Sequence, residues 1–183
     1  MVKPAHLLAL DQRDGLPDSL RVLADAYPRG TWEQHENFNQ MIQFWMQRHM
    51  MFRQLMDLLN QDAEKVMDRK IAFNDYAPRL SHYAGALLNE LHGHHHIEDA
   101  HYFPQLIQLD GRIEKAFDLL ESDHLAMDGL LHGMADGANA VLQGGEVGTF
   151  RDTLTNFGTL LERHLTDEED IVVPVVLETG FRG

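Results

Sequence analysis

The chain contains two segments in which a histidine is followed four residues later by a glutamate, and both residue types bind metal ions. The pairs are His94 with Glu98 and His164 with Glu168. In a helix this spacing places both side chains on one face, one turn apart. In each segment a proline stands six residues after the glutamate, so the pattern His-x-x-x-Glu-x5-Pro occurs twice, 70 residues apart. The repeat predicts two matching metal-binding helices.

Each pair is preceded by a further histidine that interrupts an apolar stripe of helical spacing. His49 precedes His94 by 45 residues, and His124 precedes His164 by 40. A single histidine in such a stripe is more often a hydrogen-bonded core residue than a ligand. The repetition favours the second interpretation, because the chain then consists of two related helical hairpins that each offer His and His-x-x-x-Glu.

Nitrogen and oxygen ligands of this kind suit iron, manganese or zinc. The chain has no cysteine, so thiolate sites and disulfides are excluded. Four histidines and two glutamates are more ligands than one ion needs, and a carboxylate can bridge two ions. We therefore expect two metal ions, with coordination positions left open for O₂, NO or peroxide.

The elements that must position these groups are predicted to be helices. Apolar residues recur at helical spacing, and no strand-like alternation competes with them. The long helices are expected at residues 31–68 with Thr31 as the N-cap, at 80–109 after a break at 73–78, at 113–144 and at 147–177, and a short one at 17–27. Such segments predict an all-α, up-down-up-down antiparallel four-helix bundle with a short N-terminal helical extension.

The turns between the helices allow a test of whether the candidate ligands lie at one depth. Glu98 lies 12 residues before Asp110, and His124 lies 13 residues after Gly111. Across the next turn, His124 and His164 lie 20 and 19 residues from the Gly144–Gly145 pair. A mismatch of one residue is about 1.5 Å along a helix. The groups should therefore meet in one layer of the bundle.

The composition indicates one domain, with an extension at residues 1–30 and the bundle at 31–183. The formal charge of −14 argues against nucleic acid or an anionic membrane as a partner. No apolar run approaches the roughly 20 residues of a membrane span, and the first residues do not resemble a signal peptide. We expect a soluble, cytoplasmic protein, and the sequence makes no prediction of its oligomeric state.

The acidic run at residues 167–170 is interpreted as a solvated face from which only Glu168 points inward. Burying four imidazoles and two carboxylates without a metal would leave many polar groups to satisfy, and unpaired buried carboxylates are costly. This cost favours metal binding by the whole set over a set of ordinary core histidines.

Residues 32–178 resemble the hemerythrin-like (HHE cation-binding) domains. The residues that carry the resemblance are His49, His94, Glu98, the run Tyr102, Phe103, Pro104, and His124, His164, Glu168 and Pro174. The resemblance implies a di-iron centre that is bridged by the two glutamates, is bound terminally by histidines and takes up O₂ or a related small ligand.

The match is incomplete at one position. Oxygen-carrying hemerythrins have a further histidine four residues after the equivalent of His124, where this chain has Asp128. His95, His101 and His35 are further candidate ligands, as is Asp128 itself. Because Asp128 stands where the oxygen carriers have this histidine, the resemblance supports reversible O₂ carriage less than it supports metal binding.

Three functions agree with these residues. The first is a protein that binds or senses O₂, NO or peroxide, and we favour it over a turnover enzyme. The second is a ferritin-like di-iron oxidase, oxygenase or iron-handling protein, which would use Glu-x-x-His pairs such as Glu98 to His101 and Glu121 to His124. The third is a structural zinc or nickel site, although structural zinc usually takes four ligands. Zinc or manganese could also substitute for iron.

Overall fold

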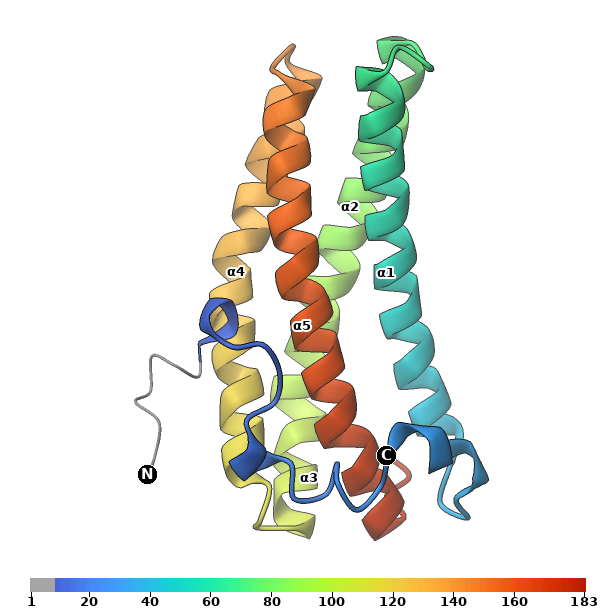
Figure 1. The fold of residues 1–183 in the computed structure, drawn as a ribbon, viewed down its shortest axis with the longest axis vertical. Coiled ribbons are helices and arrows are strands. Elements are labelled where there is room, and N and C mark those ends of the chain that lie inside the picture. Colours follow the sequence, from blue (N-terminus) through green and yellow to red (C-terminus); the bar gives the residue numbers. More distant parts are fainter. Residues whose placement is uncertain (1–8) are drawn as a thin grey trace.

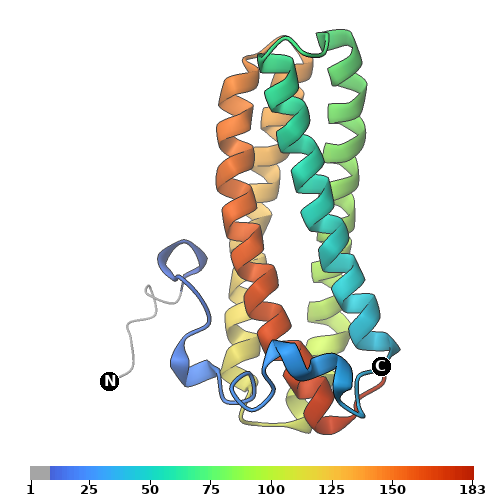
Figure 2. The same ribbon diagram turned by 45° about the vertical axis from the view of Figure 1, so that its right-hand side comes forward.

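Long helices run side by side along the molecule and reverse direction at each turn (Figures 1 and 2). The computed structural model describes residues 9–183. The long helices are α1 (Gln40–Met67), α2 (Phe73–Ile97), α4 (Glu114–Leu142) and α5 (Val147–Thr179), and the short α3 (Phe103–Leu109) follows α2. α1 contacts α2 and α5, and α4 contacts the same two helices. The up-down-up-down bundle predicted from the sequence is confirmed.

The start of α1 differs from the prediction. The side chain of Asn39 caps this helix, because its Oδ1 accepts hydrogen bonds from the backbone N–H groups of Met41 (3.0 Å) and Ile42 (3.3 Å). Thr31, the expected N-cap, lies instead in a short 3₁₀ helix, η4 (Arg29–Gln34), where its hydroxyl donates to the carbonyl of Pro28. The prediction of Thr31 as N-cap is therefore wrong.

The start of α2 also differs from the prediction. A break was expected at residues 73–78, but the helix begins at Phe73 and contains Pro78. Proline removes one backbone donor from a helix, and the helix continues because its apolar face is buried, with Tyr76 and Leu80 fully enclosed on either side of Pro78.

Among its described residues, the N-terminal extension is helical only in short 3₁₀ segments, so the helix expected at 17–27 is reduced to one turn at residues 18–20. It contains the 3₁₀ helices η2 (Leu10–Gln12), η3 (Asp18–Leu20) and η4, and η2 and η4 contact α5. Leu16, Leu23 and Trp32 from the extension are buried in the core. Its residues before position 9 lie outside the described part of the chain, and the division into domains at residue 30 stays a prediction.

The core consists of two apolar clusters with a polar layer between them. Along α1, Phe52 belongs to one cluster and Trp45 to the other, and the buried His49 lies between them. On α5, Leu165 and Ile171 belong to different clusters, with Glu168 between them. On α4, Leu120 and Met127 likewise belong to different clusters, and between α2 and α3 the same holds for Leu91 and Phe103. The fold therefore places one polar layer between two apolar clusters.

No helix among residues 9–183 combines the length and the apolar character that crossing a lipid bilayer requires.

The cap of α1 gives the first prediction. Replacing Asn39 with Ala should lower the free energy of unfolding by about 1 kcal/mol, because two backbone donors lose their acceptor. Chemical denaturation of the purified protein would measure this. The matched control is Thr31→Ala, which should cost less than about 0.5 kcal/mol. An equal cost for both variants would show that Asn39 is not the effective cap.

Candidate metal centre

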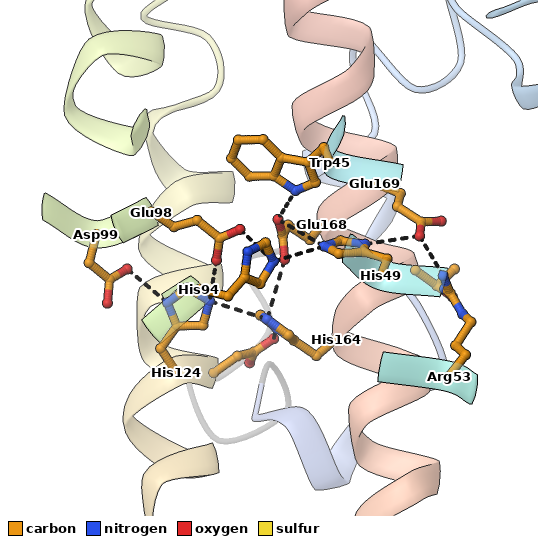
Figure 3. A network of polar contacts seen from close by, with 12 residues as sticks. Trp45, His49, Arg53, His94, Glu98, Asp99, His124, His164, Glu168 and Glu169 are labelled. Carbon is orange, nitrogen blue, oxygen red and sulfur yellow. Dashed lines mark hydrogen bonds and ion pairs between the residues drawn. The ribbon is translucent and has the colours of Figure 1, made fainter. Parts of the chain in front are cut away.

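The polar layer brings histidines and glutamates together from every long helix (Figure 3). His49 comes from α1, His94 and His95 from α2, His124 from α4, and His164 and Glu168 from α5. Glu98 is the first residue of a five-residue π-helix, η5 (Glu98–Tyr102), between α2 and α3. These seven residues form two groups of possible metal ligands, His49, His94, Glu98, Glu168 and His95, His124, His164.

In the first group the ring nitrogens converge on one point. Nε2 of His49 lies 3.1 Å from Nε2 of His94, which in turn lies 2.8 Å from Oε1 of Glu98. Oε1 of Glu168 is 3.5 Å from Nε2 of His49. Four ligand atoms from three helical segments and the π-helix thus surround a space of the size that one metal ion needs.

The second group consists of histidines alone. Nε2 of His124 lies 3.2 Å from Nε2 of His164. The ring of His95 stacks on that of His124 with their centroids 4.0 Å apart. His95 is buried, and neither of its ring nitrogens has a hydrogen-bond partner within residues 9–183. A buried imidazole with both nitrogens unsatisfied is costly unless another group, such as a metal ion, occupies one of them.

The two glutamates connect the groups. Glu98 directs Oε1 toward His94 and Oε2 toward Nε2 of His124, at 3.6 Å. Glu168 directs Oε1 toward His49 and Oε2 toward Nε2 of His164, both at 3.5 Å. Each carboxylate therefore offers one oxygen to each group of histidines.

Most of these carboxylate oxygens lack a proper hydrogen-bond donor. Both oxygens of the fully buried Glu98, and Oε2 of Glu168, have no donor of acceptable geometry among the described residues. Oε1 of Glu168 accepts a hydrogen bond from the indole N–H of Trp45. Buried carboxylate oxygens without donors match a site that is completed by cations.

Three further carboxylates hold the outer nitrogens of the histidines. Nδ1 of His49 lies 3.0 Å from Glu169, Nδ1 of His124 lies 2.8 Å from Asp99, and Nδ1 of His164 lies 3.3 Å from Asp123. A carboxylate at Nδ1 accepts its proton, so the lone pair of Nε2 faces the centre of the bundle. Carboxylates arranged in this way orient metal-binding histidines and make them stronger ligands.

These carboxylates were missed in the sequence, although a signal was present. Each is the direct neighbour of a predicted ligand, because Asp99 follows Glu98, Asp123 precedes His124 and Glu169 follows Glu168. Asp167 and Glu169 were both expected on a solvated face, and both are buried. That expectation is wrong because arginines from other parts of the chain reach these side chains.

Glu169 and Asp123 are each neutralised by arginines. Arg29 and Arg53 donate to Glu169 at 2.6 and 2.7 Å. Arg13, from the N-terminal extension, forms a two-pronged ion pair with Asp123 and also donates to Asp167 at 2.9 Å. The extension therefore reaches the metal layer through Arg13, Asp123 and His164.

The neighbouring arginines and histidines shift the pKa values of Glu169 and Asp123. Burial alone would raise the pKa of Glu169, but His49, Arg53 and Arg29 lower it to about 2. Burial opposes ionisation of Asp123 as well, and Arg13 together with His164 still holds the pKa of Asp123 below its usual value. Both carboxylates are therefore ionised and able to hold the Nδ1 protons.

The inner groups have shifted pKa values of both signs. Burial, with Glu168 nearby, raises the pKa of Glu98 well above its usual range. Burial would also raise the pKa of Glu168, but His49 lowers it well below its usual range. Burial disfavours the charged form of His49, but the negative charges of Glu168 and Glu169 outweigh this effect and raise the pKa of His49 to about 9. Burial lowers the pKa of His94 to about 3. The proton on Glu98 and the Nε2 proton of the charged His49 ring must leave before both residues can bind a metal ion, while the Nδ1 proton of His49 stays with Glu169.

The remaining candidate ligands lie outside the two groups. His35 is half-buried, and its Nδ1 accepts a hydrogen bond from the backbone N–H of Asn37. His101 and Asp128 are exposed. Glu121 is exposed as well, so the two Glu-x-x-His pairs of the ferritin-like alternative do not converge. Metal ligation by each residue stays a prediction.

Comparison with known proteins gives one match. A family model described as the hemerythrin HHE cation binding domain matches residues 40–176, which covers every residue of the two groups. No match was found among curated proteins or among solved structures.

The link through Arg13 gives a second prediction. Arg13→Ala leaves the buried Asp123 and Asp167 without their cation and should lower the free energy of unfolding by about 3 kcal/mol, since breaking a buried ion pair leaves an uncompensated charge. It should also speed the loss of bound metal to a chelator.

The matched control is Arg21→Ala, also in the extension, which removes only an exposed ion pair with Asp25. This variant should change stability by less than about 0.5 kcal/mol and leave metal retention unaltered. Similar metal loss in both variants would contradict a specific role for Arg13.

Proposed function

The chain belongs to the hemerythrin HHE cation-binding domain family, and from this premise we propose that it holds a di-iron centre that binds or senses O₂, NO or peroxide. Its family and its buried groups of histidine and glutamate identify it as a metal-binding protein. The presence of two ions, their identity as iron and the small ligand are our proposal.

One observation carries the proposal of two ions. Glu98 and Glu168 each direct one oxygen to each group, so either carboxylate can bridge an ion held by His49 and His94 and an ion held by His95, His124 and His164. A single ion could not contact both groups of histidines through these short contacts. Two bridging carboxylates would also offset part of the positive charge that two metal ions bring into the buried layer.

The donor set favours iron among the metals that nitrogen and oxygen ligands suit. Two histidines with carboxylates, as in the first group, are the ligands of many non-haem iron sites that keep positions open for an external ligand. The second group has one histidine more, so it leaves fewer positions open. Manganese or zinc could occupy the same ligands, but a structural zinc site would need only four of them.

The chain itself contributes orientation and exclusion of water. Bound iron would supply redox chemistry and open coordination positions for a small ligand. Glu169, Asp99 and Asp123 hold the Nδ1 protons so that the Nε2 atoms face inward. The indole of Trp45 holds one oxygen of Glu168. The apolar clusters above and below the layer shield the site from bulk water along the axis of the bundle.

The third prediction tests the function directly. Protein purified without a tag and without oxygen should contain about two irons per chain by mass spectrometry, and admission of air should produce new absorption bands in the near-ultraviolet to visible range. Reversal of the bands on removing O₂ would indicate binding rather than turnover.

Other outcomes of this measurement separate the alternatives. Many irons per chain would indicate the ferritin-like iron-handling function. A single zinc, or no metal and no spectral change, would contradict the di-iron proposal and leave a helical bundle with clustered histidines.

The fourth prediction concerns the ligands. His94→Ala, His95→Ala and His164→Ala should each reduce the bound metal, because each removes an inward-facing nitrogen from one group. The control is His132→Ala, which removes an exposed ring whose Nδ1 contacts only the carbonyl of Asp128 in its own helix. Metal content by mass spectrometry, with circular dichroism to verify helix content, is the measurement. Equal loss in the His132 variant would show that the ligand set is wrong.

A further inference from the structure

A pocket of about 390 Å³ lies beside the metal layer, between α1 and the segment formed by α2 and η5. His94 and Glu98 line its inner wall, and both belong to the first group of metal ligands. Trp45 also lines the pocket, and its indole N–H donates a hydrogen bond to Glu168 (Figure 3). The pocket therefore opens from the surface of the molecule onto His94 and Glu98 of the first group.

The walls of the pocket are mainly aromatic and aliphatic. Phe44, Trp45 and Tyr102 contribute rings, and Ile97 contributes an aliphatic side chain. Phe44 and Ile97 remain 58% and 49% exposed, which is unusual for large apolar side chains on the same rim. An exposed apolar rim around a concave site is typical of pockets that bind small organic molecules.

The charges of the pocket are already compensated. Arg48 and Glu90 face each other across its mouth and form an ion pair of 2.6 Å. Glu98 at the inner end is a metal ligand in the proposed centre. Because neither an unpaired cation nor an unpaired anion is left on the rim, a neutral ligand is favoured over a charged one.

The volume exceeds what a diatomic ligand requires. A water molecule occupies about 30 Å³ in the liquid, so the pocket has room for on the order of ten atoms other than hydrogen. The value lies within the range of roughly 300–1,000 Å³ that is typical of small-molecule sites. O₂ or NO would fill only a small part of it.

We propose that this pocket binds a neutral hydroxylated aromatic molecule of about one ring, with its hydroxyl group directed at His94 and Glu98 and its ring between Phe44, Trp45 and Tyr102. The aromatic side chains offer offset or edge-to-face contacts to a ring. The inner end of the pocket is polar, and an ion held there by His94 and Glu98 would offer the hydroxyl oxygen an open coordination position. The contact of the hydroxyl group rests on the proposed di-iron centre, whereas the contacts of the ring do not depend on it.

Gly93 allows a specific test of the pocket. It lines the pocket, and a Cβ atom added to it meets no other atom within 4 Å. Gly93→Leu should therefore fill the space without disturbing α2. Gly85, also in α2, has equally open surroundings and does not line the pocket, so Gly85→Leu is the matched control.

The fifth prediction is made for isothermal titration of the metal-loaded protein with phenol. Phenol should bind saturably at one site per chain. Gly93→Leu should weaken this binding at least about tenfold, whereas Gly85→Leu should leave it unchanged. No saturable binding to the unaltered protein, or equal binding to the Gly93→Leu variant, would overturn the proposal.

Two additional measurements separate this proposal from the proposed function. The iron content of the Gly93→Leu variant should equal that of the unaltered protein, and azide should still change its visible spectrum. Loss of phenol binding with both of these properties retained supports an organic site distinct from the metal centre. Loss of iron in this variant would show that the substitution disturbs the centre itself and would overturn the assignment of Gly93 to a separate pocket.

Discussion

The structure depends on the burial of two carboxylates, Glu98 and Glu168, in one layer of an otherwise apolar core. Ionised carboxylates in such surroundings are costly unless cations and hydrogen-bond donors compensate them. Histidines supply part of the compensation, and the oxygens that no donor reaches leave the rest to metal ions. An apolar cluster closes this layer at each end along the axis of the bundle. Metal ions bound in this layer would therefore stabilise the folded chain.

Charge compensation continues outward from the centre in alternating shells of opposite sign. The ring of His49 contacts Glu169, which is held by arginines from α1 and from the extension. On the opposite side, His164 contacts Asp123, which is held by Arg13. The extension thus participates in the order of the centre although it contributes none of the seven candidate ligands. Its buried leucines and its arginines act together, because the apolar contacts fix the backbone from which the long cationic side chains reach inward.

The sequence predicted the bundle and the residues of its polar layer well, because both follow from regular helical spacing. His49, His94, Glu98, His124, His164 and Glu168 converge, as the distances from the turns had indicated. The helix starts were predicted less well. The cap of α1 depends on a single oxygen of Asn39, and α2 includes Pro78 because burial outweighs one lost hydrogen bond. The buried state of Asp167 and Glu169 depends on arginines more than 100 residues away in the sequence, and no local pattern contains that information. Likewise, η5 depends on packing, because its five residues have no distinctive composition.

The π-helix makes the two halves of the molecule mechanically unequal. α5 continues without interruption from Val147 to Thr179, whereas the corresponding helix pair α2 and α3 is joined by the wide turn of η5. The hydrogen bonds of a π-helix span one residue more than those of an α-helix, so such a turn can exchange one pattern for the other with little change elsewhere. Glu98 stands at the beginning of this wide turn, and Glu168 stands inside α5, which continues past Pro174. If Glu98 and Glu168 bridge two ions as proposed, a change at the centre would reach α3 through the π-helix on the Glu98 side and would meet one continuous helix on the Glu168 side.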